Sequence, residues 1–273
     1  MADEGPMTKT PQQRHDVRAY GEGEHTLVLI HGYGCDKTMW NSVIPLLQDK
    51  YRIVVYDLLG CGASDLSQYD KARYATLDGH AQDLIDVIEA MDTEQPTLVG
   101  HSVSAMTATL AANRLGDKVA NVVMVCPSPS FINDGDYIGG FETSDIDALL
   151  ETLEANYLGW SSEMAPAIMG TPDMPEHCET LTNSFCQADP DIARHFARVT
   201  FRADHREDVK ALEHDALLIQ CRDDVIVPDA VGQWMQDNMK AADLVVLDAT
   251  GHCPHISYPK ETAAAITRYL APA

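Results

Sequence analysis

The 273-residue sequence predicts an α/β fold, a mostly parallel, doubly wound sheet with a helical insertion. Two observations predict it. Short apolar runs alternate along the chain with stretches of helical periodicity, an order typical of a sheet with helices on both faces. The alternation stops after Cys126 and resumes at Ala216, and helical patterns fill the interval. The length suits one α/β core that carries one insertion.

Six apolar runs bounded by turn residues are the expected strands. Continuous runs such as VVMVC and LVLIH suit strands that are buried on both faces, as in a parallel sheet. The expected strands are Thr26–His31, Arg52–Asp57, Pro96–Gly100, Ala120–Cys126, Ala216–Cys221 and Leu244–Leu247. Near the N-terminus, His15–Tyr20 and His25–Ile30 flank a Gly-Glu-Gly-Glu segment, so we expect them to pair as a hairpin at the sheet edge.

The helices are expected between these strands. Apolar residues recur at helical spacing from Leu77 to Met91, with acidic residues between them. A second apolar face runs from Ile146 to Tyr157, inside the interval that holds no strong strand. We therefore expect residues 1–126 and 212–273 to form the core domain, and residues 127–211 to form a helical lid inserted in it.

The chain is strongly acidic. Its formal net charge is −23, and the stretch Val119–Ala193 holds 13 acidic residues and no Lys or Arg. Such a surface repels nucleic acids and anionic membranes, so neither is expected as a partner. Two explanations of the acidity remain open: adaptation to salty surroundings, where a dense carboxylate surface keeps a protein soluble, and an acidic docking face for a partner.

Several further features bear on the compartment. No run of 18 apolar residues is present, so no membrane span is expected. The first 25 residues lack the basic-then-apolar layout of a signal peptide. The seven cysteines form no CxxC pair, which suits a reducing compartment, so we expect a cytoplasmic protein. Because neither H-E-x-x-H nor a paired cysteine spacing occurs, we expect neither a metal nor a cofactor.

The first chemical motif is Gly100-His101-Ser102-Val103-Ser104, which follows an expected strand and precedes a helical stretch. A sharp strand-to-helix turn in this setting presents a serine hydroxyl above the sheet as a nucleophile. Ser102 is therefore the expected nucleophile. Ser104 stands where the motif G-x-S-x-G has its last glycine.

A serine hydroxyl is a poor nucleophile at neutral pH and needs an adjacent base. His252 follows Gly251 in the loop after the last expected strand. The carboxyl ends of parallel strands share one edge of a sheet, so we expect this loop to meet the Ser102 turn there. His252 is the expected general base, and His255 is its competitor.

A carboxylate is expected to orient the imidazole. Asp223 and Asp224 both follow the preceding expected strand, and the chain order Ser, Asp, His is a known order for such a triad. Spacing does not separate these two aspartates. Asp248, four residues before His252, is a weaker candidate.

Acyl transfer also needs N–H donors for the developing oxyanion. His31-Gly32-Tyr33-Gly34 follows an expected strand, and its glycines let the backbone approach a substrate. The backbone N–H groups of Tyr33 and Val103 are the expected pair. Another Gly-rich turn, Asp57–Ser64, is expected to be structural because no Lys follows it and it opens no clear helix.

Together these motifs resemble the RsbQ-type α/β-hydrolases, bacterial regulators of a stress sigma-factor pathway that are similar to the plant strigolactone and karrikin receptors. The similarity runs from about Val28 to Tyr258 and includes the expected lid. The matching motifs are Gly100–Met106, Pro127–Phe131, Gly139–Glu142, Asn156–Trp160, Phe185–Cys186, Asp189–Ala193, Asp204–Asp208 and Gly251–His255. Ser104 fits this resemblance, since the plant receptors also lack the last glycine of the motif.

The resemblance implies an α/β-hydrolase fold, a triad of Ser102, Asp224 and His252, and a four-helix lid over a narrow apolar pocket. It also implies the residues that line this pocket, which are Tyr33, Val103, Phe131, Trp160, Met164, Phe196 and Val199. Met164 stands where the plant receptors carry an aromatic residue, so the pocket shape is expected to differ there. For Trp160 and Phe196 the alternative is packing inside the lid.

We expect a cofactor-free serine hydrolase that cleaves a small neutral ester or lactone through an acyl-enzyme. An anionic substrate would meet a repulsive acidic approach and find no Arg or Lys to receive it. The alternative is a ligand-sensing signalling protein, whose slow hydrolysis triggers a protein partner such as the phosphatase with which RsbQ-type proteins act. Both functions need the same triad, so the sequence does not separate them.

Overall fold

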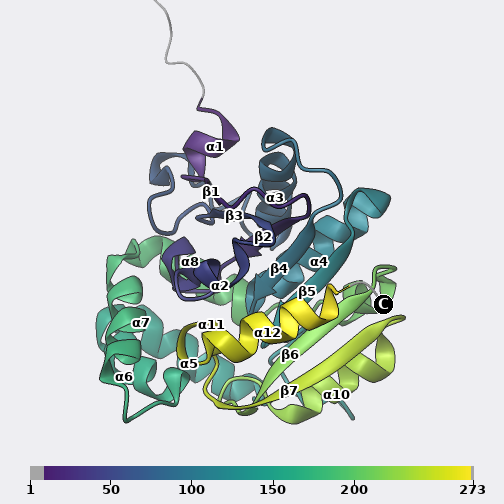
Figure 1. Ribbon diagram of the computed structural model, residues 1–273. Coiled ribbons are helices and arrows are strands. Elements are labelled where there is room, and N and C mark those ends of the chain that lie inside the picture. Colours follow the sequence, from purple (N-terminus) through teal and green to yellow (C-terminus); the bar gives the residue numbers. More distant parts are fainter. Residues whose placement is uncertain (1–8, 272–273) are drawn as a thin grey trace, which may run out of the picture.

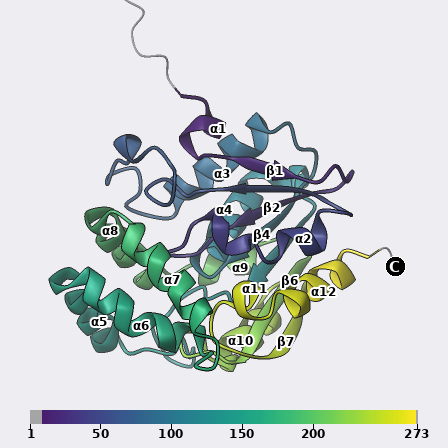
Figure 2. The same cartoon turned by 60° about the vertical axis from the view of Figure 1, so that its left-hand side comes forward.

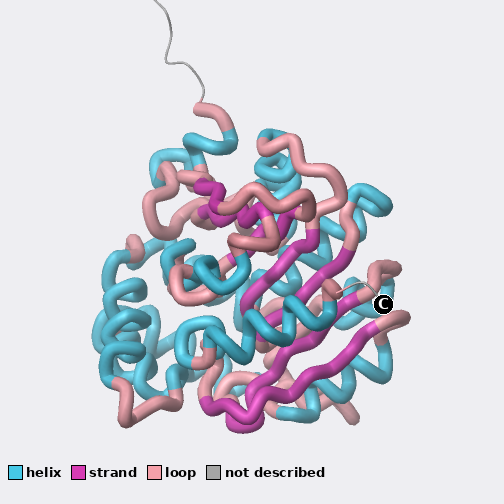
Figure 3. Tube along the Cα trace, in the orientation of Figure 1, coloured by secondary structure: helices cyan, strands magenta, loops and turns pink. Residues whose placement is uncertain are grey.

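The computed structural model describes residues 9–271. Its centre is a seven-stranded sheet in the order β1-β3-β2-β4-β5-β6-β7 (Figures 1 and 3). The strands are β1 (Arg18–Tyr20), β2 (Thr26–Ile30), β3 (Arg52–Tyr56), β4 (Thr97–His101), β5 (Asn121–Val125), β6 (Ala216–Asp223) and β7 (Ala242–Thr250). Neighbouring strands pair in parallel except β1 and β3. The predicted α/β fold with a mostly parallel sheet is confirmed, and β7 is longer at both ends than predicted.

Both faces of the sheet are covered, because alternate residues of each central strand point to opposite sides. In β2, Val28 and Ile30 belong to one core cluster with residues of α3 (Asp78–Ala90), α4 (Val103–Leu115) and α10 (Asp229–Asn238). Leu27 and Leu29 belong to a second cluster with α2 (Ile44–Leu47) and α12 (Pro259–Tyr269). The remaining short helices are α1 (Pro11–Arg14), α9 (Arg206–Ala211) and α11 (Pro254–Ser257), of which α9 lies in the interval between β5 and β6.

The predicted hairpin at the N-terminus is wrong. β1 pairs antiparallel with β3, with Tyr20 opposite Ile53, and it does not pair with β2. The physical reason is that β2 is buried along its whole length and has parallel neighbours, β3 and β4, on both sides. The exposed β1 is left with the free edge of β3, an edge position that suits an exposed strand.

Four further helices lie between β5 and β6 in the chain, and we call them the inserted helices. They are α5 (Thr143–Ala155), α6 (Tyr157–Met169), α7 (Pro175–Gln187) and α8 (Pro190–Phe201). Figure 2 shows them gathered at one side of the molecule, beside the sheet. Local capping fixes the start of α8, where the Asp189 carboxylate accepts hydrogen bonds from the backbone N–H groups of Asp191 and Ile192.

Polar contacts attach the inserted helices to the loop after β2 and to one another. The Tyr33 hydroxyl donates to the carbonyl oxygen of Ala193 (3.1 Å), and the Ser184 hydroxyl donates to that of Gly34 (2.9 Å). Between α8 and α5, Arg198 pairs with Glu154 and Arg202 pairs with Asp147. The arginines of α8 thus offset part of the acidic charge of the inserted helices.

Among the described residues, no helix has both the length and the apolar character needed to cross a lipid bilayer.

Candidate active site

Ser102 lies at a sharp turn between β4 and α4. Its φ of 55° and ψ of −125° lie in a region that residues other than glycine rarely adopt. The turn crowds the backbone, since a Cβ at Gly100 would lie 2.3 Å from the carbonyl oxygen of Ser104. This strand-to-helix turn brings Ser102 to the wall of a pocket.

Ser104 stands at the last glycine position of the motif G-x-S-x-G, and its surroundings accommodate a serine side chain. The side chain is buried, and its hydroxyl donates to the carbonyl oxygen of His31 at 2.5 Å. This hydrogen bond joins the first turn of α4 to the end of β2. The serine therefore adds a link between the two loops of the site, and its polar group is satisfied.

His252 lies in the loop after β7, with Nε2 2.8 Å from the Ser102 Oγ. The preceding Gly251 has a φ of +93°, and a Cβ there would lie 2.0 Å from the carbonyl oxygen of Met169. The backbone N–H of His252 donates to the carbonyl oxygen of Ile168 at 2.7 Å. The loop is thus packed against the end of α6, which holds the imidazole in place.

Asp224 lies on the other side of the imidazole. Its Oδ2 is 2.7 Å from the Nδ1 of His252, and its Oδ1 accepts hydrogen bonds from the backbone N–H groups of Ile226 (2.8 Å) and Val227 (3.2 Å). Because the carboxylate can only accept, this network assigns the ring proton to Nδ1. Nε2 is then free to accept the proton of Ser102.

The two other candidate carboxylates do not contact His252. Asp223 is exposed, and its carbonyl oxygen accepts a hydrogen bond from the backbone N–H of Gly251 at 2.7 Å. Asp248 has a side chain that is 91% exposed and pairs with Arg222. Of the three aspartates considered from the sequence, only Asp224 is in contact with the imidazole.

The competing histidine, His255, is a packing residue. It is fully buried, and its ring packs at a tilt against Trp40 and His101 with centroid separations of 4.5 and 4.3 Å. Burial lowers the pKa of His255 to about 3. Burial also lowers the pKa of His101 well below its ordinary value, so its Nε2 can donate as a neutral ring to the carbonyl oxygen of His252, 2.9 Å away.

The expected oxyanion donors lie on two loops beside Ser102. Val103 is the first residue of α4, where a backbone N–H has no acceptor within the helix. Gly32, next to Tyr33, lies against the nucleophile, since a Cβ there would be 3.2 Å from the Cβ of Ser102. Within residues 9–271, neither the Tyr33 nor the Val103 N–H donates to another backbone oxygen.

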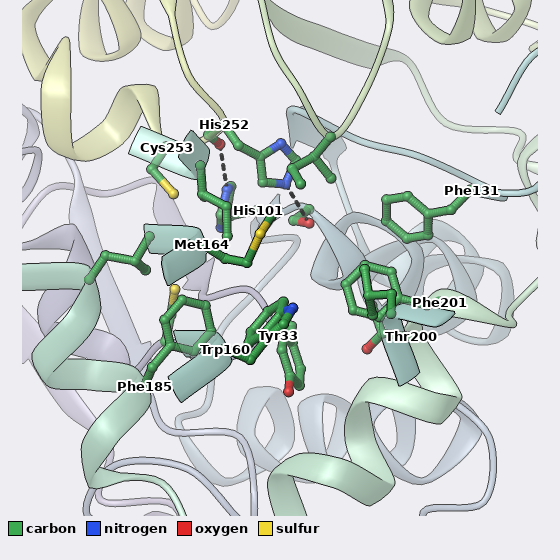
Figure 4. A pocket seen from close by; sticks show the side chains of 16 residues that line it. Tyr33, His101, Phe131, Trp160, Met164, Phe185, Thr200, Phe201, His252 and Cys253 are labelled. Atoms are coloured by element: carbon green, nitrogen blue, oxygen red, sulfur yellow. Dashed lines mark hydrogen bonds between the residues drawn. The ribbon is translucent and has the colours of Figure 1, made fainter. Parts of the chain in front are cut away.

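A pocket of about 50 Å³ opens onto Ser102 (Figure 4). Figure 4 shows His252 at one end, Tyr33, Trp160 and Phe185 on one wall, and Phe131 and Phe201 on another. The lining is mostly apolar. It consists of Tyr33, Cys35, His101, Ser102, Phe131, Leu149, Trp160, Met164, Ile168, Leu181, Phe185, Thr200, Phe201, Ile226, His252 and Cys253.

The predicted lining differs from this set at three positions. Val103, Phe196 and Val199 are not among the described residues that line the pocket. Val103 is buried at the start of α4, and Phe196 is buried with its ring against Tyr33 and His80. Val199 lies outside the buried face of α8, on a surface groove on the other side of the helix. Phe196 thus packs against two residues that lie outside the segment 127–211, so its contacts differ from the alternative of packing inside the lid as well.

Several lining residues were missed, most clearly Phe185 and Phe201. Phe185 packs on Trp160 with a centroid separation of 5.6 Å, and Phe201 packs on Phe131 at 5.3 Å. The signal for Phe185 was its helical spacing to Leu181, which gives α7 one apolar edge.

A possible group of metal ligands was also missed, because its members are far apart in the sequence. Among the described residues, ligand atoms of Cys126, Asp224 and His252 lie within 4.8 Å of one another.

The chain is similar to known proteins over most of its length. The sequence model of the Alpha/beta hydrolase family matches residues 27–265. The "Karrikin insensitive 2 receptor CA" of Petunia hybrida is 33% identical over 260 residues, which cover 95% of this chain and 96% of that protein. The "Strigolactone esterase D14" of Arabidopsis thaliana is 32% identical over 256 residues, or 93% of this chain and 96% of that protein. The predicted resemblance to the plant receptors is confirmed.

A solved structure gives the same result for the fold. The hydrolase olei00960 from Oleispira antarctica superposes with a TM-score of 0.92 at 35% sequence identity, and the match covers 95% of both chains.

Proposed function

Because this chain belongs to the alpha/beta hydrolase family, we propose that it is a serine hydrolase that cleaves small neutral esters or lactones through an acyl-enzyme. It is an ester-hydrolysing enzyme, in common with relatives that are named esterases. The observation that carries the serine mechanism is the chain of hydrogen bonds from Ser102 through His252 to Asp224. This arrangement provides a nucleophile, a base and a group that orients the base.

In the proposed first step, the Ser102 Oγ attacks the carbonyl carbon of the ester while the Nε2 of His252 takes the hydroxyl proton. Asp224 accepts the Nδ1–H bond and stabilises the imidazolium that forms. His252 then returns the proton to the departing alcohol, which leaves an acyl group on Ser102. In the second step, His252 deprotonates a water molecule, which attacks the acyl-enzyme and releases the acid.

The oxyanion of each tetrahedral intermediate would be bound by the backbone N–H groups of Tyr33 and Val103. The Val103 N–H lies at the N-terminus of the 13-residue helix α4, where the partial positive charge of the helix favours an anion. Neither donor adds a full positive charge. The site can therefore stabilise a transient oxyanion without attracting a substrate that is already anionic.

The lining supports a small neutral substrate. Among the lining residues of the described chain, none is Lys or Arg, so the wall offers no permanently charged cation to receive a carboxylate or a phosphate. The volume of about 50 Å³ is small next to typical ligand pockets of about 300–1,000 Å³. With the inserted helices as they lie, the pocket has room for a short acyl group, and a larger substrate requires these helices to move.

We also propose that residues 127–211 act as a lid on a core of residues 1–126 and 212–273. The support is that much of the pocket wall comes from this segment. Its contributions are Phe131, Leu149, Trp160, Met164, Ile168, Leu181, Phe185, Thr200 and Phe201.

The test compares two matched esters, one neutral and one carrying a carboxylate, at low and high salt. We expect the wild type to cleave the neutral ester faster at both salt levels. Ser102→Ala should lower the turnover of the neutral ester by at least about 10³-fold while the fold stays intact. Ser162→Ala, which truncates an exposed serine of α6, is the control and should keep wild-type turnover. Faster cleavage of the charged ester at both salt levels, or appreciable activity of Ser102→Ala, would contradict the proposal.

A second candidate is a ligand-sensing signalling protein that hydrolyses its ligand slowly and then engages a protein partner, such as a phosphatase. The observation that favours it is the similarity, over nearly the whole chain, to a protein named a receptor. The two functions are separated by measuring both the rate at which a ligand is hydrolysed and the shift in melting temperature that the ligand causes. A signalling protein would show a large ligand-induced shift in melting temperature together with very slow turnover.

A further inference from the structure

A group of sulfur ligands lies next to the proposed triad. Cys126 follows β5 and Cys221 belongs to the neighbouring strand β6, and their sulfur atoms are 3.9 Å apart. Among the described residues, Cys126 also forms a group with Asp224 and His252 in which the ligand atoms lie within 4.8 Å of one another. None of the proposed catalytic steps uses either cysteine.

The separation of the two sulfur atoms is close to that of two ligands in a tetrahedral metal site. With bonds to zinc of about 2.3 Å for sulfur and about 2.0–2.2 Å for nitrogen and oxygen, two sulfur ligands lie about 3.8 Å apart and the other pairs about 3.3–3.6 Å apart. The two cysteines already have this spacing. In the wider group, the Nδ1 of His252 and the Oδ2 of Asp224 are 2.7 Å apart and would have to separate by about 0.6 Å, while the Cys126 sulfur lies within 4.8 Å of its partners.

The chemical character of the group selects the kind of cation. A thiol and an imidazole are ligands for soft or borderline ions such as Zn²⁺, while Mg²⁺ and Ca²⁺ prefer sets of oxygen ligands. Cys126 is fully buried, so a charged thiolate at this position needs a cation beside it. A bound dication would offset two of the three negative charges that the two thiolates and the buried Asp224 carboxylate carry.

We propose that Cys126, Asp224 and His252 form an inhibitory site for a thiophilic divalent cation such as Zn²⁺, with Cys221 as the fourth ligand. The inference rests on the proposed function, because it takes His252 to be the general base. His252 would bind through Nδ1, the nitrogen that is 2.7 Å from Asp224. The protons of Nδ1 and of the two thiols pass to water as the cation binds.

Inhibition follows from the loss of the base. An imidazole bound to a dication through Nδ1 is much less basic at Nε2, so it no longer takes the proton of Ser102. The Asp224 carboxylate becomes a metal ligand and no longer orients the ring. His252 lines the pocket, whereas Cys126 and Cys221 are buried and are not among its described lining residues, so we expect the cation to enter past His252 and a chelator to remove it.

The activity test is a Zn²⁺ titration of ester turnover. In Cys126→Ala the concentration for half-inhibition should rise at least about tenfold, with uninhibited turnover close to that of the wild type. Cys126→Ser, which keeps the volume of the side chain, is the second variant in case alanine impairs folding. Cys35→Ala removes another buried thiol of the pocket and is the matched control, which should be inhibited like the wild type. EDTA should restore activity, and Mg²⁺ should have no effect.

Cobalt provides a readout that does not depend on activity. Co²⁺ added to Ser102→Ala should produce thiolate-to-cobalt charge-transfer absorption, which should be absent from the Ser102→Ala/Cys126→Ala double variant. The metal site would be overturned if zinc did not inhibit wild-type turnover, or if zinc inhibited both Cys126 variants as strongly as the wild type. It would also be overturned if Cys35→Ala raised the half-inhibitory zinc concentration as much as Cys126→Ala does. Cobalt absorption in a protein that cleaves no ester would instead overturn the proposed function and leave the site standing as a metal-binding site without an inhibitory role.

Discussion

Asp223 and Asp224 have the same side chain, and only the backbone gives them different surroundings. Asp223 is the last residue of β6 and is exposed, whereas the side chain of Asp224 is 2% exposed. In Asp224, two backbone N–H groups hold one oxygen and thereby aim the other at His252. Residue types and spacing predicted the pair of candidates. Residue types and spacing could not indicate which aspartate contacts His252, because that depends on how the chain turns after β6.

The two aspartates are therefore matched probes of the proposed triad. Asp224→Asn should lower the rate of ester turnover by about 10³–10⁴-fold, because an amide at this position favours the wrong tautomer of the imidazole. Asp223→Asn should keep most of the activity. Steady-state kinetics of both variants, with melting temperatures as the control for folding, test this. A larger loss in Asp223→Asn would contradict the role of Asp224.

At the scale of elements, α8 shows what helical periodicity can and cannot supply. The sequence predicted an insertion of helices in this interval, and α8 buries one face made of Ala193, Phe196, Ala197, Thr200 and Phe201. Family resemblance placed Phe196 and Val199 in the pocket. The described residues on the pocket wall are instead Thr200 and Phe201, because the helix turns Phe196 toward Tyr33 and turns Val199 away from the buried face. Periodicity predicts a buried face, but which part of that face meets a cavity depends on the neighbouring elements.

Phe201 and Val199 test this assignment of faces. Phe201→Ala should enlarge the cavity, so the ratio of kcat/KM for a butyryl ester to that for an acetyl ester should rise at least about tenfold. Val199→Ala removes apolar volume two positions away but should leave the ratio unchanged. Initial rates with the two esters provide the measurement. An equal change in both variants would show that the pocket wall has been assigned wrongly.

At the scale of the whole molecule, the sequence predicted the central strands well and the sheet edge poorly. Central strands such as β2 and β4 are apolar and buried on both faces, so local composition suffices to find them. The partner of β1 depends on which edge of the assembled sheet is free, and no local pattern carries that information. No local pattern predicts the pocket volume either, since it results from the docking of the inserted helices on the core.

Buried histidines make the stability of the whole fold depend on pH. Burial lowers the pKa of His80 and of His255 to about 3. An unfolded chain binds protons at histidine below about pH 6.5, and the folded protein does not bind them at these two sites. Their contribution to stability is therefore complete above pH 6.5, and the free energy of unfolding falls by up to about 1.4 kcal/mol per pH unit for each histidine as the pH decreases toward 3.

His80→Phe isolates one of these contributions. The substitution keeps an aromatic ring between Tyr74 and Phe196 and removes a titrating group. Between about pH 6.5 and pH 5, the wild type should lose about 2 kcal/mol more of its free energy of unfolding than the variant. Urea unfolding at the two pH values measures the difference. Parallel losses in the two proteins would show that His80 is protonated in the folded state.

The proposal as a whole depends on a covalent intermediate at Ser102. The most direct measurement is mass spectrometry of the protein after rapid acid quenching of its reaction with a short neutral ester such as p-nitrophenyl acetate. Peptide mapping should locate the added acyl group on the peptide that contains Ser102, and the Ser102→Ala variant should carry no acyl group. An acyl group attached to another residue, or sustained turnover by Ser102→Ala without any adduct, would contradict the mechanism.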